Sequence, residues 1–288
     1  MCFNPMIPGC SLIKASTRCI NLACKRESAH MKPHRRKFLL AISLAFVVAL
    51  LVLGTFWTLG LFNRSAIAHE KTPDHIVRIM PLGDSITAGD TFSKGFKTSV
   101  AGGYRTPLWS DCMQEQWHVV FVGSQVGGPA SLTDKAHEGH PGWRIDQISA
   151  HVVSWLRMYQ PDIILLQIGT NDILQHYHVN TAPARLSYLL AQISSTLPLA
   201  TTIVAQITPL GQPQLDAQVV AFNRTIPLIV KSIADQGRHI EYTDMYDAVP
   251  ESDLSDGIHP NSAGYVLMAT VWFDTLRPRF ATTQMPAN

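Results

Sequence analysis

The residue types and spacing near the two ends of residues 75–280 suit nucleophilic catalysis. Asp256 and His259 are three positions apart, which lets the carboxylate accept the Nδ1 proton of the imidazole and leaves Nε2 as a base. Ser85 lies in Gly-Asp-Ser directly after an apolar run, where a tight turn exposes a serine hydroxyl to a base and a substrate. The alternative is that both segments only cap the helices that follow them.

Two further loops contain groups that can donate hydrogen bonds to an oxyanion. Residues 137–145 read His-Glu-Gly-His-Pro-Gly-Trp-Arg-Ile, in which the backbone N–H of Gly142 is one candidate donor. The side-chain amide of Asn171, in Gly-Thr-Asn-Asp, is a second candidate. The alternatives are an ordinary Pro-Gly turn and a turn in which Asp172 caps a helix. We expect His137 and His140 to be structural or to face a substrate, because no third metal ligand is evident nearby.

These groups must be positioned by the strands and helices between them. Apolar runs without alternation predict five strands that are covered on both faces, at 75–82, 117–123, 162–168, 201–208 and 240–244. Helical patterns lie between them, at 104–115, 145–159, 184–197, 214–236 and 262–276. This alternation predicts an α/β domain with a parallel five-stranded sheet between helix layers, and its functional residues at the carboxyl ends of the strands.

The N-terminal region has the pattern of a membrane or export segment. Residues 38–62 are almost wholly apolar and follow a basic cluster at 32–37. At ~1.5 Å per residue, such a helix can cross a hydrocarbon core of about 30 Å. We expect a transmembrane signal anchor at 38–62, with 1–37 cytoplasmic or spurious, 63–74 a linker, and the domain 75–280 extracytoplasmic at the cell membrane. The alternative is a signal peptide cleaved after Ala68, which would give a secreted protein.

Composition excludes several classes of function. The formal net charge of +2 and the lack of a basic stripe after the leader argue against a nucleic-acid partner. Cys112 is the only cysteine of the predicted domain, which excludes an internal disulfide there. We expect no cofactor and no metal, because neither a phosphate-binding glycine loop nor a metal-ligand cluster is present.

Taken in order, Gly-Asp-Ser, the glycine loop, Gly-Thr-Asn-Asp and Asp-Gly-x-His-Pro resemble the conserved blocks of the SGNH (GDSL) hydrolase superfamily. The resemblance covers essentially all of 75–280. Gly-Gly-Tyr-Arg at 102–105, the loop 137–143 and Asp-Gly-Ile-His-Pro-Asn at 256–261 are most similar to the acetylxylan esterases of carbohydrate esterase family three. The resemblance implies a flavodoxin-like three-layer α/β/α fold and metal-independent ester hydrolysis.

Carried over position by position, the resemblance makes Ser85 the nucleophile, His259 the base and Asp256 its orienter. It implies an oxyanion hole made of the Ser85 N–H, the Gly142 N–H and the side chain of Asn171. One departure is Pro141, where a serine is expected before the glycine. A proline removes one N–H but leaves that of Gly142, so the departure bears mainly on the shape of the loop.

The expected function is an extracytoplasmic serine esterase that removes O-acetyl groups from carbohydrates through an acyl-enzyme. Its partners would be an acetylated saccharide or another small ester and, through the N-terminal helix, the membrane. The alternatives are a GDSL lipase, lysophospholipase or thioesterase, an acyltransferase acting on cell-surface glycan, and an inactive glycan-binding module. An acyl-chain enzyme would need a long apolar groove, whereas a sugar site would expose aromatic side chains. Tyr104, Trp109 and Trp143 are the candidates for such side chains, and the alternative is that at least two of them are plain core residues.

Overall fold

A computed structural model of the protein describes residues 75–89 and 100–281. The predicted segments 1–37 and 38–62 and the linker 63–74 lie outside the described residues. Over the two ranges that are described, we find no helix with the length and apolarity needed to span a membrane.

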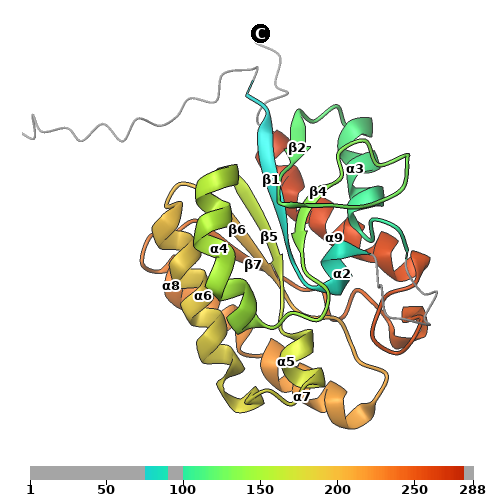
Figure 1. Ribbon diagram of the computed structural model, residues 1–288, viewed down its shortest axis with the longest axis vertical. Coiled ribbons are helices and arrows are strands. Elements are labelled where there is room, and N and C mark those ends of the chain that lie inside the picture. The colour runs from blue at the N-terminus through green and yellow to red at the C-terminus, as the bar shows by residue number, and fades with distance from the viewer. Residues whose placement is uncertain (1–74, 90–99, 282–288) are drawn as a thin grey trace, which may run out of the picture. The chain divides into compact units, whose positions relative to one another are not determined.

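The centre of the fold is a mixed seven-stranded sheet (Figure 1). Its strands pair in the order β3-β4-β1-β5-β6-β7, and β2 pairs with β1 beside β4. The strands are β1 (Val77–Gly83), β2 (Val119–Phe121), β3 (Gln125–Val126), β4 (Ala136–Gly139), β5 (Ile163–Gln167), β6 (Thr201–Ala205) and β7 (Ile240–Thr243).

The prediction of a purely parallel five-stranded sheet is wrong in two respects. The five predicted strands exist and pair in parallel, as β2, β1, β5, β6 and β7. However, β4 adds a further parallel strand at the end of β1, and β3 pairs antiparallel with β4. The apolar pattern misses β4 because its sequence is Ala-His-Glu-Gly, in which the polar side chains of His137 and Glu138 are buried.

Helices cover both faces of the sheet, as the sequence predicts. One predicted helix, 214–236, is two helices in the structure, because Pro227 in the first turn of α8 lacks the N–H that a continuous helix needs. The helices are α2 (Ser85–Ala88), α3 (Arg105–Gln114), α4 (Ile145–Tyr159), α5 (Thr170–Leu174), α6 (Ala182–Thr196), α7 (Pro213–Asn223), α8 (Ile226–Ala234) and α9 (Ser262–Ala281), with 3₁₀ turns at Val179–Thr181 and Glu251–Asp253.

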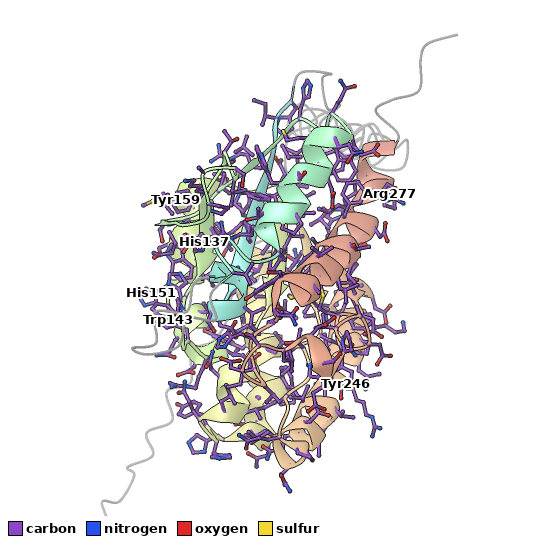
Figure 2. The ribbon with its side chains drawn as sticks, turned by 90° about the vertical axis from the view of Figure 1, so that its right-hand side faces the viewer. His137, Trp143, His151, Tyr159, Tyr246 and Arg277 are labelled. Atoms are coloured by element: carbon purple, nitrogen blue, oxygen red, sulfur yellow. The ribbon has the colours of Figure 1, made fainter. Side chains whose placement is uncertain are left out.

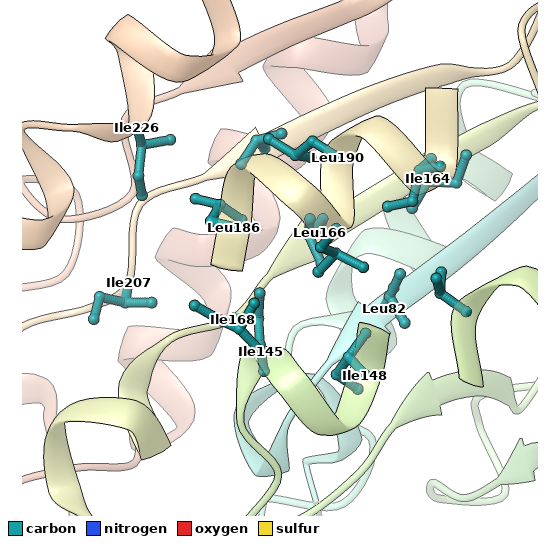
Figure 3. Packing of buried hydrophobic residues seen from close by; sticks show 14 of the residues in the cluster. Leu82, Ile145, Ile148, Ile164, Leu166, Ile168, Leu186, Leu190, Ile207 and Ile226 are labelled. Carbon is teal, nitrogen blue, oxygen red and sulfur yellow. The ribbon is translucent and has the colours of Figure 1, made fainter. Parts of the chain in front are cut away.

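Two apolar cores lie on the two faces of the sheet. Successive residues of β5 alternate between them: Ile164 and Leu166 pack with α4 and α6, whereas Ile163 and Leu165 pack with α3 and α9. Figure 3 shows the first of these cores. The continuous apolar run of β5 therefore reflects burial on both faces, and the fold is an α/β fold with helices on each side.

The sheet brings three segments together at the carboxyl ends of its parallel strands. Helix α2 begins where β1 ends and α5 begins just beyond β5, so both start at the carboxyl ends of parallel strands (Figure 1). Strand β4 leads into residues 140–144, and the His140 N–H donates to the Gly83 carbonyl at 2.9 Å. A Cβ atom on Gly139 would lie 2.5 Å from the Ala88 backbone nitrogen, so a glycine is needed where β4 meets α2.

Candidate active site

The structure brings Ser85, His259 and Asp256 into one hydrogen-bonded chain. The Ser85 Oγ atom lies 2.9 Å from His259 Nε2, and His259 Nδ1 lies 2.8 Å from Asp256 Oδ2. Ser85 is the first residue of α2, just after the end of β1, and only 8% of its surface is exposed. The two ends of the domain, 174 positions apart, therefore meet at this point.

Hydrogen bonds inside the loop 254–261 hold Asp256 and His259 together. Asp256 Oδ1 accepts from the backbone N–H groups of His259 at 2.7 Å and Ile258 at 3.0 Å, while Oδ2 faces the imidazole. The His259 carbonyl accepts from the backbone N–H of Ser255 at 2.8 Å. The Asp-x-x-His spacing is thus a local turn that presents the imidazole to Ser85.

The charge state of Asp256 decides the proton positions in this chain. Burial raises the pKa of Asp256, but the hydrogen bonds from the backbone and side chain of His259 outweigh it, and the pKa lies below its ordinary value. An ionised carboxylate can only accept, so His259 carries its proton on Nδ1. Its Nε2 atom is then an acceptor for the hydroxyl proton of Ser85, which is the arrangement that a general base requires.

Residues 140–143 form a tight turn beside the end of β1. The Trp143 N–H donates to the His140 carbonyl at 3.1 Å, with Pro141 and Gly142 in the two central positions. Gly142 has a φ of +80°, which makes this a type II turn and explains why a glycine follows the proline. Gly142 is exposed, in the loop whose first residue donates to Gly83.

Asn171, in the first turn of α5, is buried against the same loop. Its Nδ2 atom donates to the Trp143 carbonyl at 3.0 Å and, in a longer bond of 3.3 Å, to Asp84 Oδ2. Asp84 also caps α2, since its Oδ1 atom accepts from the Ile86 N–H at 2.9 Å. The predicted oxyanion donor is therefore next to the predicted nucleophile, and in the free protein its amide already has two protein acceptors.

Asp84 and Asp172 are buried carboxylates on either side of Asn171. Burial raises the pKa of Asp84 to about 6, against the opposing hydrogen bond from Ile86. Burial also raises the pKa of Asp172, which accepts from the Ile145 N–H and forms an ion pair with Arg185 at 2.7 Å. Asp172 thus joins the first turn of α5 to the start of α4.

The imidazoles of His137 and His140 both have hydrogen-bond partners within residues 137–140. Burial lowers the pKa of His137 to about 3, so its imidazole is neutral, and its Nδ1 atom accepts from the Gly139 N–H. His140 Nε2 lies 2.9 Å from the fully buried Glu138. Within the described residues, no group of three or more His, Cys, Asp or Glu side chains is arranged to hold a metal ion.

An aromatic stack extends from the glycine turn to α4. The ring of His140 stacks on those of Trp143, at a centroid distance of 4.3 Å, and Trp155, at 4.7 Å, and the two tryptophan rings are themselves 6.1 Å apart. His151 packs against Trp143 at 5.2 Å, and Figure 2 labels both residues. Trp143 is therefore a partly buried support of the turn, although part of its ring remains accessible.

The other two candidates for sugar stacking, Tyr104 and Trp109, lie away from the Trp143 turn. Tyr104 has no exposed surface and belongs to the core, so its expected role in sugar stacking is wrong. Its neighbour Arg105 is also fully buried and donates to the Thr87 and Ala88 carbonyls at the end of α2. Trp109 is partly exposed in a groove between α3 and α9. The Gly-Gly-Tyr-Arg motif thus supports the helix that carries Ser85.

The sequence did not point to Gln175, which links two loops of the site. Its Nε2 atom donates to the Gly142 carbonyl at 2.8 Å, and its Oε1 atom accepts from Arg144 at 2.6 Å. The guanidinium of Arg144 also stacks on Tyr177, 4.0 Å from the ring centroid. Gln175 follows Asn171 by one helical turn, and this spacing is the only sequence signal that could have placed it on the same side of α5.

The chain is similar to known proteins in sequence and in overall structure. A model of the GDSL-like lipase/acylhydrolase family matches residues 82–267, more than half of the chain. A family 3 carbohydrate esterase from Clostridium thermocellum is similar in structure, with a TM-score of 0.61 and 33% identity over 72% of this chain and 98% of that one. A family 3 carbohydrate esterase from Talaromyces cellulolyticus has a TM-score of 0.61 and 26% identity over 72% of this chain and 99% of that one.

The chain is also similar to a curated protein, the "Multidomain esterase" of Ruminococcus flavefaciens. The two are 28% identical over an alignment of 228 residues that covers 69% of this chain. The chain spans only 28% of the length of that relative. The match therefore concerns one part of a larger protein.

Proposed function

The chain belongs to the GDSL-like lipase/acylhydrolase family, and from this premise we propose that it is a serine esterase that removes acetyl groups from carbohydrates. The observation that carries the proposal is the hydrogen-bonded chain from Ser85 through His259 to Asp256. These are the three roles of a nucleophile, a general base and the group that orients the base. Acyl transfer to Ser85 needs no group outside the chain itself.

In the proposed mechanism, Ser85 Oγ attacks the ester carbonyl carbon while its proton passes to His259 Nε2. Asp256 accepts the Nδ1–H hydrogen bond and stabilises the imidazolium that forms. The carbon–oxygen bond to the sugar then breaks, and His259 gives the proton to the leaving alcohol. Water attacks the acetyl-Ser85 ester by the same route, releasing acetate and restoring the serine.

The negative charge of the tetrahedral intermediate would be held by the Ser85 N–H, the Gly142 N–H and the Asn171 amide. Ser85 begins α2, so its N–H has no partner within the helix. For Asn171, the 3.0 Å bond to the Trp143 carbonyl holds the amide in place, and the longer bond to Asp84 leaves a weaker contact with which an oxyanion can compete.

The carbohydrate part of the proposal rests on the similarity to two family 3 carbohydrate esterases, both covered almost completely by this chain. A second candidate, hydrolysis of longer acyl esters, is favoured by one observation. A groove of about 560 Å³ lies between α3 and α9, with Val100, Pro107, Trp109, Met113 and Val266 among the apolar side chains that line it. It reaches Gly103, on which a Cβ atom would lie 3.1 Å from the Ile86 carbonyl, next to Ser85.

Initial rates on p-nitrophenyl acetate, butyrate and octanoate, and acetate release from acetylated xylan, separate these candidates. The proposal predicts faster hydrolysis of p-nitrophenyl acetate than of the octanoate, and acetate release from the polysaccharide. Both activities should be lost with Ser85→Ala. Ser232→Ala, the same change at an exposed position of α8, is the matched control. A preference for octanoate would favour the groove beside α3, and activity that survives Ser85→Ala would contradict the proposal.

Location is a further part of the proposal. The apolar run at 38–62 supports an anchor with the domain outside the cytoplasm, and Ala66-Ile67-Ala68 supports cleavage instead. Membrane fractionation, followed by sequencing of the N-terminus of the mature protein, distinguishes these two outcomes. A cytosolic protein with an intact N-terminus would contradict both.

A further inference from the structure

We propose that a groove between α4 and α6 binds the saccharide chain that carries the ester, so that part of the substrate is held outside the reacting centre. The groove has a volume of about 570 Å³, which is in the range of ligand-binding sites. It is lined by Asp146, Ser149, Ala150, Thr181, Ala184, Arg185, Tyr188 and Gln192. The inference rests on the proposed function and names a second contact of that same substrate.

The first reason is an aromatic ring that the fold leaves uncovered. Tyr188 has 64% of its surface exposed, although it lies in the middle of a helix that packs its other face on the core. The other large apolar side chains exposed in the described part of the chain are aliphatic or methionine. An exposed aromatic ring provides a flat apolar surface with a hydroxyl at its edge, which suits the C–H face of a sugar ring.

The second reason is the polar chemistry around that ring. Ser149 on α4 donates to the Gln192 Oε1 atom on α6, a bond that crosses the groove and orients the amide. This leaves the two N–H donors of the Gln192 side chain outside that bond. The hydroxyl of Thr181 lies at one end of the same groove and accepts from Arg185 at 2.8 Å. Hydroxyl and amide groups at fixed positions match the alternating donors and acceptors of a saccharide.

The third reason is charge. Asp146 and Arg185 are the two charged residues that line the groove, one of each sign. Each is already ion-paired: Asp146 accepts from Arg144 at 2.9 Å, and Arg185 donates to Asp172 at 2.7 Å. A phosphate, a nucleic acid or an acidic peptide would have to compete with these carboxylates or break the pairs. The groove therefore favours a neutral ligand, as an acetylated saccharide is.

The same two ion pairs connect the groove to the candidate active site. Asp146 is four residues after Gly142, which limits their separation to roughly 14 Å. Arg185 contacts Asp172, the residue after Asn171. The groove thus begins beside the glycine turn and the Asn171 loop, where the sugar side of a bound ester would leave the reacting centre.

The test is the binding of xylohexaose, measured by titration calorimetry with the full chain carrying Ser85→Ala, which removes turnover. Adding Tyr188→Ala is expected to raise the dissociation constant about tenfold, because stacking on the ring is lost. Tyr188→Phe keeps the ring and is expected to bind as the parent does. Ala150→Trp, at an exposed position of α4, would fill the groove and is expected to weaken binding in the same way.

In the active chain, Tyr188→Ala is expected to raise KM for acetylated xylan while kcat/KM for p-nitrophenyl acetate stays unchanged. Unchanged xylohexaose binding in both Tyr188→Ala and Ala150→Trp would overturn the inference, and so would a parent that binds no xylohexaose. Tighter binding of an oligogalacturonate than of xylohexaose would overturn the argument from charge. A chain that binds xylohexaose through Tyr188 but cleaves no ester would contradict the proposed function and leave the groove supported.

Discussion

The loop 254–261 holds Asp256 and His259 with hydrogen bonds among its own residues, whereas Asn171 is held by groups from distant parts of the chain. The pairs Asp256–His259 and Ser255–His259 are three and four positions apart. Asn171 is bonded to Trp143, 28 positions away, and to Asp84, 87 positions away. One half of the site is thus a local turn, and the other half exists only when the sheet has formed.

The two halves also differ in burial. The side chains of His259 and Asp256 remain 15% and 19% exposed, while that of Asp172 has no exposed surface. Because buried hydrogen bonds contribute to folding as well as to chemistry, changes around Asn171 should lower both stability and rate. Changes in the loop should lower the rate alone.

The largest expected effect is that of His259→Ala. Without a base for the Ser85 proton, kcat for p-nitrophenyl acetate should fall on the order of 10⁵-fold or more. The unfolding free energy should change by less than about 1 kcal/mol, since Asp256 Oδ1 still accepts from the loop backbone. Stopped-flow or spectrophotometric rates and urea unfolding measure the two quantities. A large loss of stability would contradict the view that this loop is separable from the core.

Asp256→Asn should have the next largest effect. The amide cannot stabilise the imidazolium and favours the wrong tautomer of His259, so kcat should fall by about 10⁴-fold. The hydrogen bonds to the backbone N–H groups can be kept by the amide oxygen. Asp253→Asn, three positions earlier in the chain, is a matched control for which the rate should stay near that of the parent. Equal losses in the two variants would mean that the effect is only one of loop charge.

Asn171→Ala should lower kcat by ~10²–10³-fold, the usual effect of losing one oxyanion donor. Unlike the changes in the loop, it should also lower the unfolding free energy by about 1–3 kcal/mol, because the partly buried carbonyl of Trp143 and the buried Asp84 carboxyl lose a donor. Measuring both quantities on one preparation tests the contrast between the halves. A variant that keeps full stability would place Asn171 outside the buried network.

The last prediction concerns the Asp84 carboxyl, whose effect appears in the pH dependence of stability rather than in the rate. Its pKa is raised by burial from 3.8 to about 6, so the folded state keeps a proton that the unfolded chain loses near pH 4. The contribution of this group to the unfolding free energy is therefore highest below pH 4 and falls as the pH rises through 6. A shift of about two units corresponds to about 3 kcal/mol, or about a hundredfold in the folding equilibrium.

Asp84→Asn keeps an acceptor for the Ile86 N–H and has no charge to bury. Urea unfolding of the parent and of this variant across pH 4–7 should show a steeper fall in the parent than in the variant, in which Asp172 still titrates. Parallel curves for the two proteins would show that Asp84 does not titrate in this range.

The same contrast explains what could be predicted from the sequence. Asp256 and His259 are candidates from their spacing, and Ser85 is a candidate from Gly-Asp-Ser at the end of an apolar run. Their roles come from the resemblance of the ordered motifs to one hydrolase superfamily. Gly142 and Asn171 could be named as candidates, but the contact of Asn171 with Trp143 and Asp84 depends on how β4 and β5 flank β1. No local pattern carries that pairing, and β4 itself has no apolar run.

The errors have the same cause. Tyr104 is a candidate for sugar stacking or for the core on sequence alone, and in the structure its ring packs against Trp272 in the core, with centroids 5.8 Å apart and planes tilted by 41°. No sequence pattern indicates the roles of Gln175, Arg144 and Arg185, because these roles arise from contacts between segments that are distant in the sequence. Helix periodicity predicted α4 to the residue, since its apolar face packs on the sheet in the simplest way.

The central claim is that Ser85, activated by His259, attacks the carbonyl carbon of the substrate. The most direct measurement is incubation of the protein with a serine-directed fluorophosphonate, followed by mass spectrometry of its peptides. We expect one phosphonyl group on Ser85, no label in Ser85→Ala, and much slower labelling in His259→Ala. A label on another residue, or equally fast labelling without His259, would contradict the account.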